Sequence, residues 1–181
     1  MHITREDYPA GSMRFEVSHS FSVGPEVVAA ASLDPAFQAT LETIGSLKER
    51  KVLSQETTGD GLVERRVRCV LALELSGMAA SLLGDADPAW IQVETWAADT
   101  MTWTWRIEPE VHAELLSAEG STVIAGEAEK ATRTVMGDVK VRVPLYGGKV
   151  EGWIVKGISE AYDEEAARLT EWLDAAIAKK R

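Results

Sequence analysis

The chain has 181 residues, of which 45% are hydrophobic and 27% charged, so it can build one domain around one sizeable core. Its formal net charge of −10 disfavours binding to nucleic-acid backbones and to anionic membrane surfaces. The single cysteine, Cys69, excludes an intrachain disulfide and a cysteine-based zinc site, and the three histidines lack metal-ligand spacing. We therefore expect no metal and no nucleic-acid partner.

Residues 1–12, "MHITREDYPAGS", carry no apolar signal-peptide core, and we expect them to form an N-terminal tail. No stretch approaches the roughly 18 apolar residues of a membrane span. These features predict a cytoplasmic protein without membrane insertion.

Residues 13–23 alternate in polarity and predict a half-buried strand, with Phe15, Val17 and His19 on its inner face. Gly24–Pro25 then suits a helix start, and Asp34–Pro35 suits a second one with Asp34 as the N-cap. Gly45 is a C-terminal stop. Two short helices should therefore follow the first strand.

Six further strands are predicted between residues 46 and 143. They cover 46–57, 62–75, 89–97, 101–107, 113–126 and 128–143, with an Asp-Gly turn at 57–61 and a loop with one helical turn at 76–88. The inner faces should carry Leu71, Leu73, Trp103, Trp105, Val139 and Val141, whereas the parity of 89–97 is ambiguous.

Arg65 interrupts the inner face of the strand at 62–75. An inward arginine needs an anionic partner, so either it pairs with a carboxylate or it lies in solvent near the Asp-Gly turn. We expect the solvent position, as for the rest of the basic stretch "ERRVR" at 64–68.

Residues 148–179 repeat apolar side chains, Ile154, Ile158 and Tyr162 among them, every three or four positions. The predicted helix is roughly 45 Å long at 1.5 Å per residue. It follows "VPLYGGKVEGW", where a proline ends the strand and two glycines permit a sharp reversal. Gly152 and Gly157 weaken its beginning, so we expect 148–158 to act as a hinge and lid.

The order strand, two helices, six strands, long helix predicts an α+β fold, with a strongly curved antiparallel sheet wrapped around the last helix. It resembles the SRPBCC superfamily, also called START-like or helix-grip, over residues 13–181 as a single domain. The resemblance rests on "FEVSHSFSVGPEVVAAASLDPAF" and "VPLYGGKVEGWI". The latter is similar to an uncharacterised branch with a domain-of-unknown-function label. The resemblance implies an apolar cavity between the sheet and the helix.

We therefore expect an apolar, lipid-like or polycyclic ligand, bound by residues of the inner face and of the helix: Phe15, Val17, His19, Leu71, Leu73, Trp103, Trp105, Val139, Val141, Ile154 and Ile158. The two tryptophans serve equally well as a ligand platform or as packing. Tyr162 is assigned to helix packing and Cys69 to the core.

The absence of a phosphate-binding loop, a dinucleotide fingerprint and a catalytic-triad elbow indicates no cofactor and favours a non-enzyme. Two alternatives stay open. The first alternative is a cyclase-, aromatase- or hydrolase-like enzyme in which His19 transfers a proton. In the other interpretation, His19 is a buried residue that is hydrogen-bonded to a neighbour and has no catalytic role. The second alternative is a protein-interaction module with a solid core. The sequence leaves the oligomeric state open.

Overall fold

The computed structural model describes residues 11–45, 47–71, 88–143 and 147–179. Within them the elements are, in chain order, β1 (Met13–Phe21), α1 (Pro25–Leu33), α2 (Pro35–Ala39), β2 (Leu47–Thr57), β3 (Val63–Leu71), β4 (Ala89–Ala97), β5 (Thr102–Pro109), β6 (Leu116–Glu127), β7 (Lys130–Val141) and α4 (Gly147–Ala178). Leu73, the loop expected at 76–88 and most of the N-terminal tail lie outside the described residues.

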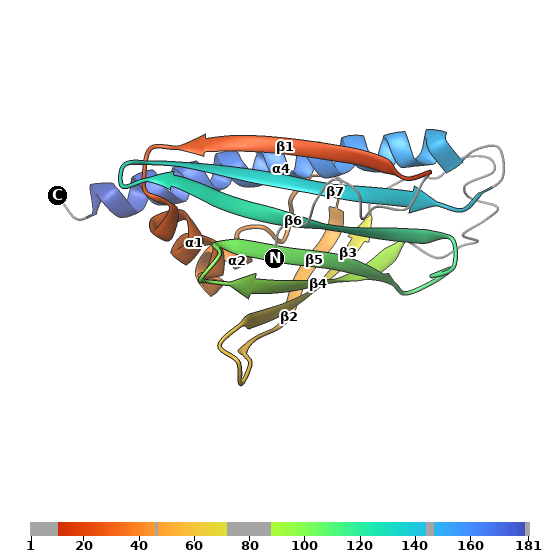
Figure 1. Cartoon of the computed structure of the whole chain (residues 1–181), viewed down its shortest axis with the longest axis horizontal. Helices are drawn as coiled ribbons and strands as arrows, with labels where there is room; N and C mark the ends of the chain where they lie inside the picture. The colour runs from red at the N-terminus through yellow and green to blue at the C-terminus, as the bar shows by residue number, and fades with distance from the viewer. Residues whose placement is uncertain (1–10, 46, 72–87, 144–146, 180–181) are drawn as a thin grey trace.

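All seven strands form one antiparallel sheet in the order β1-β7-β6-β5-β4-β3-β2 (Figure 1). The meander from β2 to β7 is the arrangement predicted from the short connections, and the α+β helix-grip architecture is confirmed. The pairing of β1 with β7 joins the first strand to the last, with Val17 opposite Val135 and His19 opposite Arg133. One continuous inner face therefore runs across the whole sheet.

Both short helices begin where the sequence predicted, but α2 ends at Ala39 and is followed by turns instead of continuing to the predicted stop at Gly45. Both have proline in their first turn, and the Asp34 side chain accepts a hydrogen bond from the Ala36 N–H at 2.8 Å as an N-cap. Gly45 has a φ of +57°, the left-handed conformation that glycine tolerates best after a helical segment. The first strand ends at Phe21, two residues earlier than predicted, because the chain bends at 22–23 before α1.

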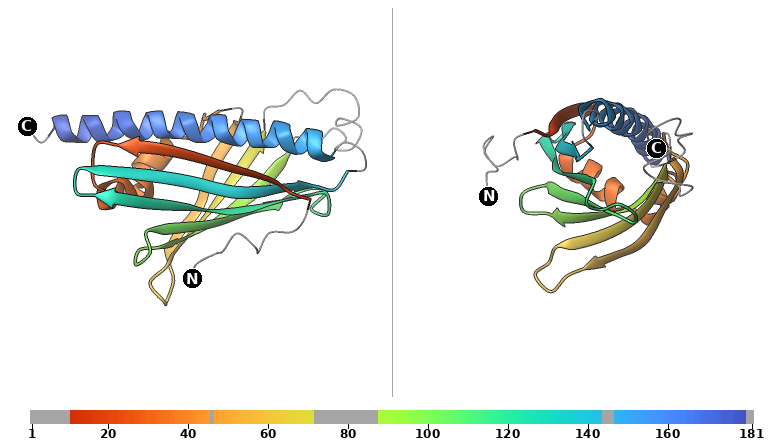
Figure 2. Two further views of the ribbon diagram at one scale, coloured as in Figure 1. Left: turned by 45° about the horizontal axis from the view of Figure 1, so that its top comes forward. Right: turned by 90° about the vertical axis from the view of Figure 1, so that its right-hand side faces the viewer.

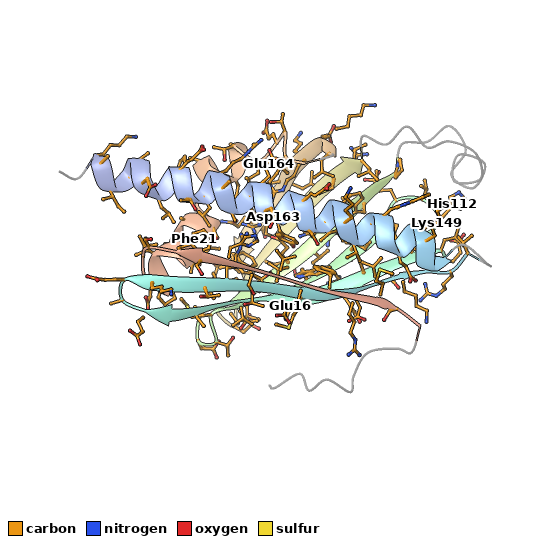
Figure 3. The ribbon with its side chains drawn as sticks, turned by 90° about the horizontal axis from the view of Figure 1, so that it is seen from above. Glu16, Phe21, His112, Lys149, Asp163 and Glu164 are labelled. Carbon is orange, nitrogen blue, oxygen red and sulfur yellow. The ribbon has the colours of Figure 1, made fainter. Side chains whose placement is uncertain are left out.

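The helix α4 lies along β1 and β7 and also contacts α1 (Figures 1 and 3). Seen end-on, the sheet curls round from β1, beside α4, to the edge formed by β3 and β2, and α1 and α2 lie inside this curve (Figure 2). The short helices contact β2, β6 and β7. One end of the inner face is thus filled by α1 and α2, and the other faces the N-terminal half of α4.

Two apolar clusters correspond to these two ends. The first, here called the closed core, joins α1 and α2 to the C-terminal half of α4; its fully buried members include Val28, Phe37, Leu41 and Leu169. The second, here called the α4 cluster, is centred on five buried residues: Phe15, Trp105, Ala118, Val135 and Val139. Eight partly buried residues surround them: Val17, Ile107, Leu116, Val141, Ile154, Val155, Ile158 and Tyr162.

Candidate functional site

The α4 cluster contains most of the residues predicted to bind a ligand. Strands β1, β5 and β7 and the first half of α4 bring seven of them together: Phe15, Val17, Trp105, Val139, Val141, Ile154 and Ile158. The strand register explains why Phe15 and Trp105 come together. Phe15 lies opposite Gly137 on β7, Gly137 lies opposite Gly120 on β6, and Gly120 lies opposite Trp105 on β5. Phe15 and Trp105 are far apart in the sequence, so only the sheet pairing unites them.

Trp105 lies at the centre of this cluster, and its indole ring packs directly against the backbone of two glycines. A Cβ atom at either Gly120 or Gly137 would lie 2.5 Å from the indole Cζ2. The ring of Phe15 lies 6.0 Å from that of Trp105 between centroids. The sheet therefore has a shallow, aromatic floor at this point, because side chains are missing from two neighbouring strands.

The other predicted residues lie elsewhere. Trp103 belongs to the closed core, where its ring packs against Trp96 at 5.3 Å between centroids. Leu71 is the last residue of β3 and is partly buried, outside both clusters. Cys69 is a buried core residue as predicted, and burial raises the pKa of its thiol to about 12.

His19 lies where β1 meets α4, and both of its ring nitrogens have neighbours. Nε2 is 2.8 Å from a carboxylate oxygen of Asp163, and Nδ1 is 3.5 Å from Nη2 of Arg133. Asp163, near the middle of α4 (Figure 3), is well exposed, whereas the His19 side chain is largely buried. His19 thus bridges the surface and the interior, held by side chains rather than by the backbone.

Arg65 is buried, and the expected solvent position is wrong. Its side chain points inward, is about 5% exposed, and forms an ion pair with Glu94 on β4, with Nη2 and Oε2 2.5 Å apart. Its guanidinium also donates to the Ser32 carbonyl at 2.9 Å and lies 4.4 Å from the centre of the Trp103 ring. Burial is tolerated because a carboxylate, a carbonyl and an aromatic face together replace water.

A second buried arginine, Arg133 on β7, was not singled out from the sequence. Its Nη1 forms an ion pair with Glu165 of α4, and its Nη2 donates to the Tyr162 carbonyl at 3.3 Å. Burial disfavours the charged form of Glu165, but the positive charges of Arg133, Arg50 and Arg65 prevail and lower the pKa of that carboxyl. Glu165 is therefore held against β7 by its ion pair with Arg133.

The third buried arginine is Arg50 on β2, which donates from Nη2 to the Gln38 side-chain oxygen at 2.8 Å. Gln38 in turn donates to the Ser32 carbonyl, which also accepts from Arg65. We call Arg50, Arg65 and Arg133, with Glu94, Glu165 and Gln38, the arginine network. The sequence contained one signal for these inward arginines. Arg65 and Arg133 each lie two residues from a buried valine of the same strand, and residues at that spacing point to the same face of a sheet.

The outer face of the sheet carries the remaining basic residues of "ERRVR". Arg66 pairs with Glu108, and Arg68 with Glu49 and Glu110, as a solvated strand face should. A half-open hollow of about 450 Å³ lies on this side, lined by Lys48, Glu49, Arg68, Val70, Ala89, Glu110 and Val111. Its charged groups largely pair with one another, and it is separate from the α4 cluster.

Among the described residues, no three His, Cys, Asp or Glu side chains gather closely enough to hold a metal ion. The described helices include none that is sufficiently long and apolar to cross a bilayer.

Comparison with known proteins decides the family. The model of the family described as "Protein of unknown function (DUF2505)" matches residues 16–173. The chain belongs to the DUF2505 family. The predicted membership of a family that carries a domain-of-unknown-function label is thereby confirmed, and no curated protein matches this DUF2505 chain significantly.

Solved structures confirm the fold. The DUF2505 chain is similar to TTHA0849 from Thermus thermophilus, with 17% identity, a TM-score of 0.64, and coverage of 91% of this chain and 99% of the other. It is similar to the Zhui aromatase/cyclase from Streptomyces sp. R1128, with 10% identity, a TM-score of 0.65, and coverage of 92% and 96%. A START superfamily protein from Mycobacterium smegmatis has 13% identity, a TM-score of 0.59, and coverage of 90% and 99%.

Proposed function

We propose that this DUF2505 chain binds an apolar small molecule between the inner face of the sheet and the N-terminal half of α4. One observation carries the proposal: the two halves of α4 are packed differently. In the C-terminal half, the inward residues Leu169 and Leu173 are buried in the closed core. In the N-terminal half, Ile154 and Ile158 pack on the α4 cluster and yet stay partly accessible.

The strands opposite that half show the same pattern, since Val17 and Ile107 point inward and are also partly accessible. Native cores are close-packed, so inward apolar side chains that keep accessible surface favour a space that a ligand fills. Removing about 300 Å² of apolar ligand and protein surface from water would contribute roughly 7 kcal/mol before the costs of association.

Native mass spectrometry after gentle purification tests the proposal directly, as does binding of the neutral fluorescent probe N-phenyl-1-naphthylamine. We expect a saturable fluorescence increase at one site per chain. A packed interior would give neither a co-purifying ligand nor probe binding, and that outcome would leave the interaction module as the better hypothesis.

A pair of variants locates the site. Ile158→Trp places a large ring into the α4 cluster and should weaken probe binding at least fivefold while the chain stays folded, because the ring occupies space. Ile177→Trp adds the same ring near the exposed C-terminal end of α4 and should leave binding unchanged. If Ile158→Trp instead unfolds the protein, the cluster is already full, as overpacking of a tight core predicts.

The enzyme alternative with His19 has less support, because Asp163 and Arg133 occupy both ring nitrogens. The interaction module also has little support from the surface of the described chain. Its exposed large hydrophobic side chains, Val27, Leu53, Val111, Trp153 and Ile177, are spread over different elements or, on α4, over opposite ends.

A further inference from the structure

The interior of this chain contains buried hydrogen-bond donors that lack acceptors. Within the described residues, four buried side-chain polar atoms have no partner: Nη1 of Arg50, Nε of Arg133, and the indole nitrogens of Trp90 and Trp105. All four are N–H groups, and not one is an oxygen acceptor. A buried donor without an acceptor costs about 1–3 kcal/mol, and more if it is charged, so such groups call for an explanation.

The arginine network also has a surplus of positive charge. Arg65 is matched by Glu94 and Arg133 by Glu165. Arg50, about 9% exposed, has only the neutral amide of Gln38 as its partner among the described residues. Within the arginine network, the Arg50 guanidinium is therefore the one that has no carboxylate partner among the described residues.

Several contacts place this charge beside the apolar cluster. Trp105 is itself a member of the α4 cluster. Tyr162 packs against the same cluster, and its ring centre lies 5.8 Å from the Arg133 guanidinium. The backbone carbonyl of Tyr162 also accepts a hydrogen bond from Arg133. Arg133 is also bonded to Glu165 of α4, whereas Arg50 is bonded to Gln38 of α2, and the positive charges of both act on Glu165. An apolar surface thus ends at a group of donors.

We infer that the ligand is an amphipathic carboxylic acid, whose apolar body lies on the α4 cluster and whose carboxylate accepts hydrogen bonds from Arg50 and Arg133. The inference rests on the proposed function and adds the ligand's chemical class. A carboxylate supplies acceptor oxygens for the unpartnered N–H groups and a negative charge for Arg50, and a guanidinium suits its planar geometry. The Trp105 indole contributes an apolar floor and one more donor at the junction.

Matched pairs of acid and alcohol test this inference. Displacement of N-phenyl-1-naphthylamine is measured for decanoate against 1-decanol, and for 2-naphthoate against 2-naphthylmethanol, which also tells whether a chain or a ring suits the site. We expect the acid of at least one pair to bind about tenfold more tightly than its alcohol, which corresponds to about 1.4 kcal/mol.

Variants assign the preference to residues. Arg50→Met should lower the ratio of acid to alcohol affinity about tenfold, and Trp105→Phe, which removes only the N–H and part of the ring, should lower it about threefold. Arg106→Met removes an exposed arginine of β5 that is paired with Glu108, and should leave the ratio unchanged. The ratio of acid to alcohol affinity does not change when a variant weakens the binding of both ligands equally. The comparison of acid with alcohol on the wild-type chain tests the inference even if a variant does not fold.

The outcomes separate the two proposals. Probe binding with equal affinities for acid and alcohol, or with a ratio that Arg50→Met leaves unchanged, overturns the carboxylate inference and leaves the proposed function standing. The absence of any probe, acid or alcohol binding overturns both.

Discussion

Replacing Arg65 by methionine removes the cation of the Arg65–Glu94 pair while keeping a long apolar side chain. Glu94, about 8% exposed, then keeps only the hydrogen bond from the Gln92 amide at 2.6 Å. The Ser32 carbonyl loses one of its two donors, and Trp103 loses the guanidinium on its face. The substitution thus leaves a carboxylate buried without its counter-charge.

The magnitude follows from these contacts. Removing one partner of a buried ion pair costs about 3–5 kcal/mol, because the remaining charge is desolvated without compensation. In a chain of this size, such a loss corresponds to a decrease of roughly 6–20 °C in the melting temperature. The double variant Arg65→Met/Glu94→Met removes both charges and should recover at least about 2 kcal/mol relative to Arg65→Met.

Urea denaturation followed by circular dichroism measures these free energies of unfolding. Arg66→Met is the matched control, since Arg66 is the next residue, faces outward and pairs with Glu108 in partial contact with solvent, so that it should cost less than about 1 kcal/mol. If Arg65→Met costs no more than this control, or if the double variant equals the sum of the single ones, the buried pair does not hold β3 to β4 as described.

Hydrogen exchange should be faster in residues 148–158 than in 162–177, because the first half of α4 is interrupted by Gly152 and Gly157 and has fewer buried side chains; the reverse order would reject the lid. Cys69 should resist alkylation by iodoacetamide at pH 8 in the native chain and react after unfolding, because burial raises its pKa to about 12, and rapid native modification would contradict this. Glu165 has a folded pKa below its ordinary value of 4.5, so its stabilising contribution is complete above that pH and is lost as the pH falls through the folded pKa. Glu165→Gln should therefore lose less stability than wild type between about pH 5 and pH 3 in urea titrations, and identical slopes would argue against the Arg133 pair.

Local signals in the sequence were sufficient for the architecture. Alternating polarity identified the strands, and the proline and N-cap signals at Pro25 and Asp34 located the two short helices. Short connections then required an antiparallel meander, whose apolar face only the last helix is long enough to cover. The pairing of β1 with β7 was beyond such signals, because it joins segments more than 100 residues apart.

The interior charges show where pattern reasoning failed. Parity put Arg65 on the inner face of its strand, but an inward charge is costly, so Arg65 was expected to lie in solvent near the Asp-Gly turn. Whether an inward arginine is tolerable depends on what the neighbouring strand places opposite it, and the parity of the strand carrying Glu94 was ambiguous from sequence. The predicted site therefore contained the apolar residues and His19 but none of the buried arginines.

A slip of β3 against β4 by two residues would keep every valine of the inner face of β3 on that face, so hydrophobic alternation cannot distinguish the slipped sheet from the native one. The charges can. Arg65 and Glu94 are directly opposite in the register, and a two-residue slip would place Val63 or Val67 beside a buried, lone carboxylate. The pair therefore selects the correct alignment of β3 and β4 as the two strands come together.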